Sequence, residues 1–136
     1  MKKTLILVTS ILTISCQNNV PKCDDPEVFK TIYSILNENK DKIGDEYGHF
    51  PLYFYLDENI NSDNISVTEI ITNKKDTELN SCGCEGKLSI NKVEVDGNIE
   101  GKMKYEGLIQ YSAQKNSEDN IIVKVENISP LELKNK

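Results

Sequence analysis

Apolar residues recur at every third or fourth position between residues 28 and 43, a spacing that places them on one side of a helix. The stripe consists of Val28, Ile32, Ile35, Leu36 and Ile43, and Phe29 and Tyr33 broaden it. Pro26 suits the first helical position, and Asp24 or Asp25 can cap the helix before it. Gly44 follows the last apolar residue and is a candidate C-terminal cap. The pattern predicts one helix with a buried face, beginning near Pro26 and ending near Gly44.

From residue 65 onward, the period of the apolar positions changes to two. Four segments show this period, and turn-rich stretches separate them: 65–72, 82–95, 101–115 and 121–128. In the third segment Tyr105, Ile109 and Tyr111 share one side, and mostly polar residues share the other. Such alternation is typical of antiparallel strands that are covered on one face. The sequence therefore predicts four antiparallel strands in chain order, with the helix as their cover.

The predicted order, one N-terminal helix followed by a four-stranded antiparallel meander, resembles the cystatin-like and NTF2-like plan of the α+β class. A chain of 136 residues has room for one domain. The resemblance implies a cystatin-like α+β domain over residues 23–133. Such scaffolds host inhibitors, binding modules and enzymes alike, so the plan implies no single activity. Residues 45–63 show no clear period, and a short helix, an edge strand and a connector remain open there.

The first sixteen residues differ from the rest of the chain. Lys2 and Lys3 precede the mostly apolar run "LILVTSILTI". Ten helical residues cover only about half of the hydrocarbon layer of a bilayer, which is about 30 Å thick. Residues 1–15 are therefore typical of a secretory signal peptide. With Ser15 before Cys16, the segment resembles a bacterial lipoprotein signal, which implies cleavage before Cys16 and attachment of lipid such as palmitate to its thiol.

Thr13 and Ile14 stand where the common lipoprotein signal has Leu and then Ala or Ser. Ordinary cleavage nearby and an uncleaved anchor remain the alternatives, and both still export the domain. Residues 16–22 are polar and contain a proline, so we expect a linker that holds the domain near the membrane. Gln17 takes the place of the Asp that retains some lipoproteins in the inner membrane, which favours the outer membrane of the cell envelope.

The charge of the chain excludes one class of partner. All 22 acidic residues follow Cys16, whereas two of the 16 basic residues precede it, so the rest of the chain carries 14 − 22 = −8. Affinity for nucleic acid comes mainly from basic residues. The chain also contains no Arg, the side chain best suited to bidentate contacts with phosphate. We expect no nucleic-acid partner, and an acidic surface suits a basic protein partner.

Three cysteines remain after the lipidation site, and an exported protein meets an oxidising compartment where disulfides form. Cys23 lies just before the predicted helix, while Cys82 and Cys84 point to the same face of one strand. Either of them can pair with Cys23. The alternative is a metal site in which the three thiols, with His49 or Met103 as a further candidate ligand, bind Cu(I) or zinc. Because the paired spacings of a strong zinc motif are missing, we expect neither a metal nor a cofactor.

The chain also resembles a group of small exported bacterial proteins of undescribed activity. The resemblance lies in "CDDPEV", "ISVTEIITNKKD", "CEGKLSI" and "LIQYSAQKNSEDNIIVKVE", in that order. In that group a Cys before the helix accompanies a Cys in a C-x-A-x-L strand. Here Cys84 and Leu88 match this strand, with Gly86 in place of the Ala. The resemblance implies a Cys23–Cys84 disulfide, which leaves Cys82 free, paired with another chain, or in exchange with its neighbour.

Motifs of catalysis are scarce. The chain has no G-x-S-x-G, no glycine-rich phosphate loop and a single histidine. The acidic pairs lie in loops or caps, where solvated charge explains them. We expect a non-catalytic binding module of inhibitor or immunity type. The alternatives are a small envelope metal-handling protein that uses Cys82 and Cys84, and an NTF2-like enzyme.

The segment "HFPLYFYL" is a candidate docking patch, because aromatic side chains are enriched at protein interfaces. The residues of the candidate patch are His49, Phe50, Tyr53, Phe54 and Tyr55. The other interpretation is that these side chains complete the core beside the helix, since the domain has no tryptophan.

Overall fold

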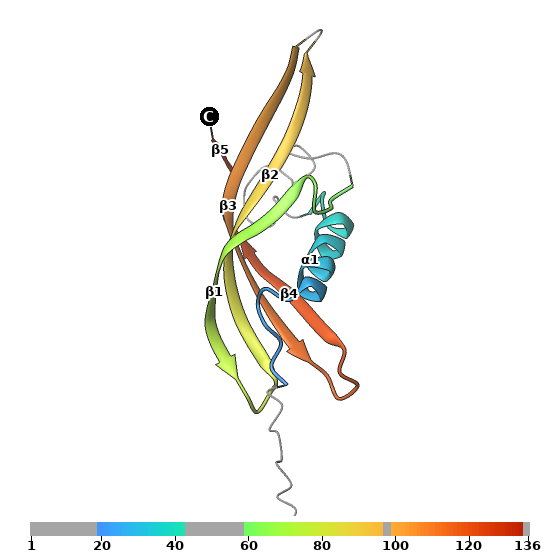
Figure 1. Ribbon diagram of the computed structural model, residues 1–136, viewed down its shortest axis with the longest axis vertical. Coiled ribbons are helices and arrows are strands. Elements are labelled where there is room, and N and C mark those ends of the chain that lie inside the picture. Colours follow the sequence, from blue (N-terminus) through green and yellow to red (C-terminus); the bar gives the residue numbers. More distant parts are fainter. Residues whose placement is uncertain (1–18, 43–58, 97–98, 135–136) are drawn as a thin grey trace, which may run out of the picture.

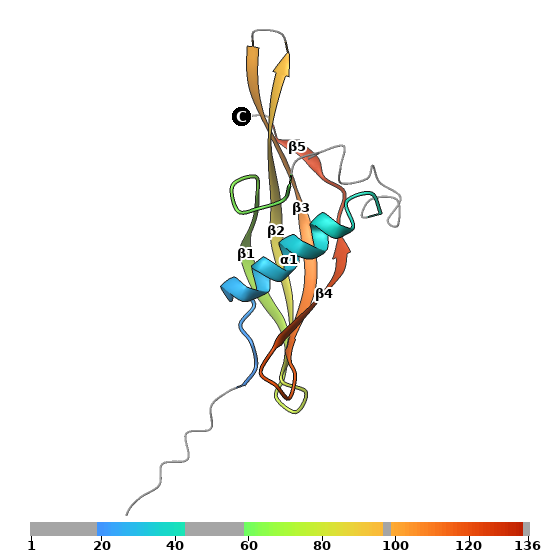
Figure 2. The same cartoon turned by 90° about the vertical axis from the view of Figure 1, so that its right-hand side faces the viewer.

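The computed structural model describes residues 19–42, 59–96 and 99–134, and within these ranges the chain forms one helix and five strands. The elements are helix α1 (Pro26–Glu38) and strands β1 (Ile65–Asp76), β2 (Ser81–Asp96), β3 (Ile99–Lys115), β4 (Ile121–Ile128) and β5 (Glu132–Lys134). The strands pair antiparallel in the order β1-β2-β3-β4, and β5 pairs with β3 beyond the end of β4. The helix crosses one face of the sheet (Figures 1 and 2). The predicted α+β class and meander are confirmed, and β5 is an addition to them.

Helix α1 begins at Pro26 as predicted. The side chain of Asp25 caps it by accepting a hydrogen bond from the Glu27 amide at 2.9 Å. The predicted end near Gly44 is wrong, because α1 stops at Glu38. The Asn39 side chain donates to the carbonyl of Ile35 at 2.8 Å and so caps the last turn. Within the described residues, no helix has the length and apolar character needed to cross a bilayer.

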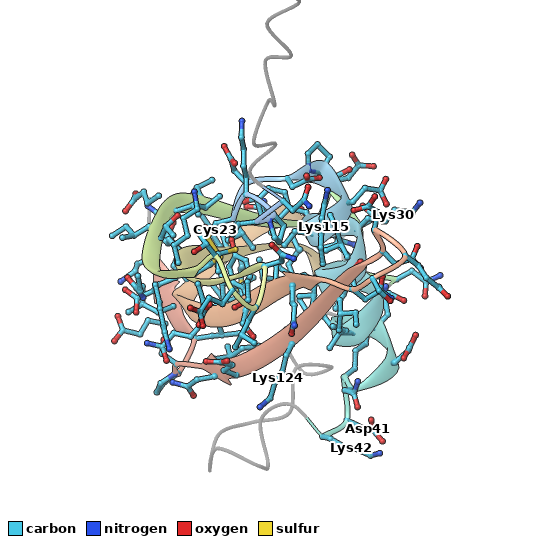
Figure 3. The ribbon with its side chains drawn as sticks, turned by 90° about the horizontal axis from the view of Figure 1, so that it is seen from below. Cys23, Lys30, Asp41, Lys42, Lys115 and Lys124 are labelled. Carbon is cyan, nitrogen blue, oxygen red and sulfur yellow. A yellow bond between two sulfur atoms is a disulfide. The ribbon has the colours of Figure 1, made fainter. Side chains whose placement is uncertain are left out.

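The core lies between α1 and the inner face of the sheet. Fully buried side chains come from one side of the helix and from alternate positions of the strands: Val28, Ile32, Leu36, Ile65, Leu88, Ile90, Ile109 and Tyr111. Figure 3 shows Lys30, Lys42 and Lys124 pointing away from the body, whereas Cys23 lies within it. The outer face of the sheet has no helix over it among the described residues and carries exposed apolar side chains between charged ones.

Strand β1 is an edge strand that contains a bulge. Its register against β2 shifts between Thr68 and Ile71, where Glu69 adopts a left-handed backbone with φ 51°. The extra residue allows both Val67 and Ile70 to face the core, while Glu69 pairs with a lysine on the outside. The side chain of Val67, which lies opposite Leu88 in the ladder, reaches the space above Gly86 of β2. A β-carbon at Gly86 would lie 2.6 Å from Val67 Cγ1, so only glycine fits there without a shift.

Strands β2 and β3 continue past the rest of the sheet. Their ladder runs to the pair Asp96–Ile99, whereas pairing with β1 ends at Ile90 and pairing with β5 ends at Lys104. Among the described residues no third strand joins this part. The two strands therefore project as an arm from the body of the domain (Figure 1).

Candidate functional site

Cys23 lies in the turn that leads into α1, and two hydrogen bonds fix its backbone. The amide of Asp25 donates to the carbonyl of Lys22 at 3.2 Å, which closes the turn. The hydroxyl of Tyr111, on the inner face of β3, donates to the carbonyl of Cys23 at 2.7 Å. Tyr111 is only 1% exposed, and this burial raises its pKa to about 12. The hydroxyl therefore stays protonated at physiological pH and keeps holding Cys23 over the sheet.

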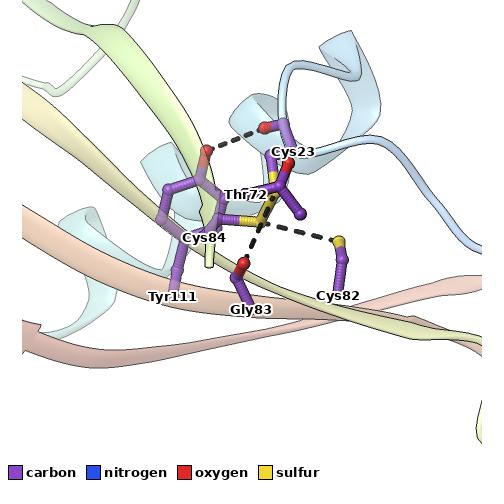
Figure 4. Close-up of a disulfide and its surroundings, with 6 residues drawn as sticks. All are labelled: Cys23, Thr72, Cys82, Gly83, Cys84 and Tyr111. Carbon is purple, nitrogen blue, oxygen red and sulfur yellow. Dashed lines mark hydrogen bonds between the residues drawn. A yellow bond between two sulfur atoms is a disulfide. The ribbon is translucent and has the colours of Figure 1, made fainter. Parts of the chain in front are cut away.

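A disulfide joins Cys23 to Cys84, and their Cα atoms are 5.7 Å apart (Figure 4). This is the pairing that the resemblance to small exported proteins implied. Both residues are buried, and the Thr72 hydroxyl of β1 donates to Cys23 Sγ at 3.3 Å. Cys84 lies opposite Thr72 on one side and Tyr111 on the other. Thr72 and Tyr111, which both donate hydrogen bonds to Cys23, therefore lie on either side of Cys84.

Cys82 is the free cysteine of the described residues, and it is buried. It lies two residues before Cys84 on the same face of β2, and the two Sγ atoms are 3.5 Å apart. Because Cys84 belongs to the disulfide, the proton in this contact belongs to Cys82. Burial raises the pKa of the Cys82 thiol, although a backbone hydrogen bond with Ala113 and the charge of Lys75 lower it. The thiol is therefore protonated near neutral pH.

A cleft of about 340 Å³ opens beside these sulfur atoms. Residues 20–24 form one wall, Thr72 and Lys75 of β1 form another, and Cys82 also lines the cleft. The three Sγ atoms lie within 4.8 Å of one another, and all three residues are buried. We call them the three-sulfur cluster: Cys23, Cys82 and Cys84. The cleft offers an ion or a small thiol a route to this cluster.

The other site residues predicted from the sequence lie outside the described residues. They are Cys16 and the aromatic patch of His49, Phe50, Tyr53, Phe54 and Tyr55. Two pairs of adjacent acidic residues, Asp24 with Asp25 and Glu118 with Asp119, lie within the described residues, and one member of each has a local structural role. Asp25 caps α1, and Asp119 takes a left-handed conformation in the turn between β3 and β4. In that turn the Asn116 side chain accepts hydrogen bonds from the amides of Glu118 and Asn120 at 2.9 and 3.0 Å.

A second, shallower hollow of about 600 Å³ runs along α1. Phe29 and Tyr33 form its apolar part, and burial raises the pKa of Tyr33. The Asn37 side chain closes one end, because it both donates to and accepts from the backbone of Ile60, at 2.8 and 2.7 Å. Among the described residues, the lining of this hollow includes no group of potential metal ligands.

The residues around the cluster that sequence reasoning missed are Thr72, Lys75 and Tyr111. The alternation in β3 places Tyr111 on the core side, but only the register between strands shows that it faces the cysteine turn. No protein-family model matches the chain, and no curated protein or solved structure gives a significant match. What the cluster can do chemically follows from its own atoms: a covalent staple, thiol–disulfide exchange, or ligation of a soft metal.

Proposed function

We propose that the chain is an exported, lipid-anchored bacterial protein whose single domain is a non-catalytic binding module of inhibitor or immunity type. The observation that carries the proposal is the buried Cys23–Cys84 disulfide at the start of the domain. Disulfides persist in oxidising compartments and are rare in the reducing cytosol. The disulfide therefore supports export, which the signal-like residues 1–15 and the lipid site at Cys16 imply.

The position of the disulfide suits a tethered domain. Six residues separate Cys16 from Cys23, and such a linker reaches at most about 25 Å when fully extended. A lipid on Cys16 thus keeps the domain close to the membrane, in this proposal the outer membrane. The plan of one helix across an antiparallel meander supports the assignment to the cystatin-like type.

The packing of the sheet favours binding over catalysis. The inner face, where an NTF2-like enzyme would have its pocket, is filled by α1 and by buried residues such as Leu88 and Ile109. The outer face and the hollow along α1 are left for a partner. Because the chain after Cys16 carries a charge of −8, a basic protein is the partner whose association its field would accelerate.

The anchor is tested by expressing the full chain in bacteria with a clickable palmitate analogue, beside the variant Cys16→Ser. We expect the wild type to carry the label, to enter the membrane fraction and to begin at Cys16 by mass spectrometry, whereas the variant does none of these. Non-reducing peptide mapping is expected to find Cys23 linked to Cys84. An unlabelled chain that begins elsewhere, with both of these cysteines reduced, would contradict the proposal.

Binding is tested by chemical cross-linking of the anchored wild type in intact envelopes, followed by mass spectrometry. We expect one basic envelope protein to be enriched at low ionic strength and lost at high salt, because screening weakens association between opposite charges. The control is an unrelated acidic domain that carries the same lipid anchor. Equal recovery of all proteins with both baits would contradict a binding role.

A further inference from the structure

The three-sulfur cluster offers more ligand atoms than a disulfide staple needs. Two of its Sγ atoms are joined in the Cys23–Cys84 disulfide, the third lies within 4.8 Å of both, and all three residues are buried. Three such atoms around one point form the ligand set that a soft, monovalent d¹⁰ cation prefers. We propose that the reduced protein binds one Cu(I) ion through the thiolates of Cys23, Cys82 and Cys84. This inference does not depend on the anchor or on the proposed binding partner.

Reduction is required before the ion can bind. A dithiol reductant transfers two electrons and two protons to the Cys23–Cys84 disulfide, which becomes two thiols while the reductant becomes a disulfide. Cu(I) then displaces one proton from each of the three thiols. A disulfide oxidant that accepts two electrons from the thiolates of Cys23 and Cys84, and becomes two thiols by taking up two protons, re-forms the bridge and removes two of the three ligands, so the ion is released. The oxidation state of the disulfide thus decides whether the site exists.

Reduction leaves the three ligands near their positions, because each is held by bonds other than the disulfide. Tyr111 donates to the carbonyl of Cys23 at 2.7 Å, and Thr72 directs its hydroxyl at Cys23 Sγ (Figure 4). Cys82 and Cys84 belong to β2, which is paired on both sides, with β1 and with β3. A preorganised site loses less free energy on ordering its ligands when the ion binds.

The number of ligands favours Cu(I) over zinc. Zinc takes four ligands in a tetrahedron, so three thiolates would leave its fourth position to water. Among the described residues, the group that can hold an ion comprises three cysteines and no histidine or carboxylate. Three thiolates are enough for Cu(I), which accepts trigonal coordination.

The cleft gives the ion a path and a favourable charge. Cu(I) with three thiolates has a net charge of −2, and Lys22 and Lys75 line the cleft together with Asp24. The lining therefore carries one more positive than negative charge among these three residues. Thr72 also supplies the kind of outer hydrogen bond that orients the ligands of protein metal sites.

The test uses the full chain with Cys16→Ser, so that only the cluster cysteines are present. The protein is reduced with a phosphine, freed of reductant without oxygen, and titrated with Cu(I) held by a chromogenic chelator. We expect one Cu(I) per reduced chain and an X-ray absorption spectrum of three sulfur ligands. The same chain with its disulfide intact is expected to take up none at the same chelator concentration.

Two further variants separate the site from general thiol binding. Loss of an outer partner alone lowers metal affinity about 10–100-fold, so we expect Cys82→Ser to weaken Cu(I) binding by at least about 100-fold. Because Cys82→Ser still forms the Cys23–Cys84 disulfide, non-reducing peptide mapping verifies its fold. The matched control Ser81→Ala, in the neighbouring position of β2, should bind like the parent. Equal binding by the oxidised chain or by Cys82→Ser would overturn the proposal, as would stronger, four-coordinate binding of zinc.

Discussion

Gly86 gives the sharpest quantitative prediction, because the space around it is closed by named atoms. A β-carbon there would lie 2.6 Å from Val67 Cγ1 and 3.2 Å from the carbonyl oxygen of Thr68. Overpacking of this kind costs about 1–3 kcal/mol. At an unconstrained site, by contrast, Gly→Ala stabilises a protein by about 0.4–1 kcal/mol, through the entropy of the unfolded chain. The balance at Gly86 is therefore set by the contact with Val67, and we expect Gly86→Ala to be destabilising.

The matched control is Gly83→Ala, three residues earlier on the same strand. There the nearest atom to a new β-carbon is Lys74 Cβ at 3.5 Å, which is an ordinary contact. We expect Gly83→Ala to be neutral or slightly stabilising. The entropy gain is common to both variants, so they should differ by the cost of the clash, about 1–3 kcal/mol in the free energy of unfolding. Urea unfolding under non-reducing conditions measures both.

A double-mutant cycle with Val67→Ala identifies the clash itself. Val67→Ala removes Cγ1, so Gly86→Ala should cost little when it is added to that variant. The steric explanation would be refuted by an equal cost of Gly86→Ala in both backgrounds, or by equal stabilities of Gly83→Ala and Gly86→Ala. The outcome also shows whether the packing around Gly86 requires glycine at this position of β2. Here the bulge in β1 directs both Val67 and Ile70 at that position.

Three further predictions concern the cysteine turn, and the first two use Cys82→Ser so that no thiol can attack the disulfide. Reducing the Cys23–Cys84 bridge, which closes a separation of 61 residues, should lower the free energy of unfolding by about 4 kcal/mol in urea titrations, and an unchanged midpoint would contradict this. The pKa of Tyr111 is raised from 10.0 to about 12, so its stabilising contribution is complete below pH 10. Above pH 10 it should fall by about 1.4 kcal/mol per pH unit, over a narrower range in Cys82→Ser because the charge of Cys82 is a lesser cause of the raised pKa, and Tyr111→Phe should show a shallower slope. In the wild type, burial and the raised pKa of Cys82 should make alkylation of its thiol slow in the native state and fast in urea.

The parts of the fold that the sequence predicts are those that local patterns determine. Pro26 and Asp25 define the start of α1, and the period of two identifies β1 to β4. The predicted end of α1 near Gly44 was wrong. The helix ends at Glu38, where the Asn39 side chain donates back to the carbonyl of Ile35, although Ile43 continues the apolar stripe in the sequence. Strand β5 has three exposed residues, and only its pairing with β3 identifies it.

The candidate site was predictable only in part, for a related reason. The period of two places Cys82 and Cys84 on one face, so it cannot decide which of them pairs with Cys23. That choice depends on where the turn at Cys23 lies along β2. Tyr111 fixes the turn by bonding the Cys23 carbonyl, and Tyr111 lies opposite Cys84 in the ladder. This information lies in the register that pairs Cys84 with Tyr111 and in the hydrogen bond from Tyr111 to the distant residue Cys23.

The position of the disulfide also determines how the domain would bear a pull on the proposed lipid anchor. With a lipid on Cys16, force on the chain reaches Cys23 before it reaches α1. The disulfide passes that force to Cys84 in β2, which is hydrogen-bonded to strands on both sides. After reduction, the same force would act on the Tyr111 hydrogen bond and then on α1. Cu(I) bound to the three-sulfur cluster would restore a link between Cys23 and β2. In the reduced, metal-bound state, force on the N-terminal segment would therefore again be transmitted to β2, as it is through the disulfide.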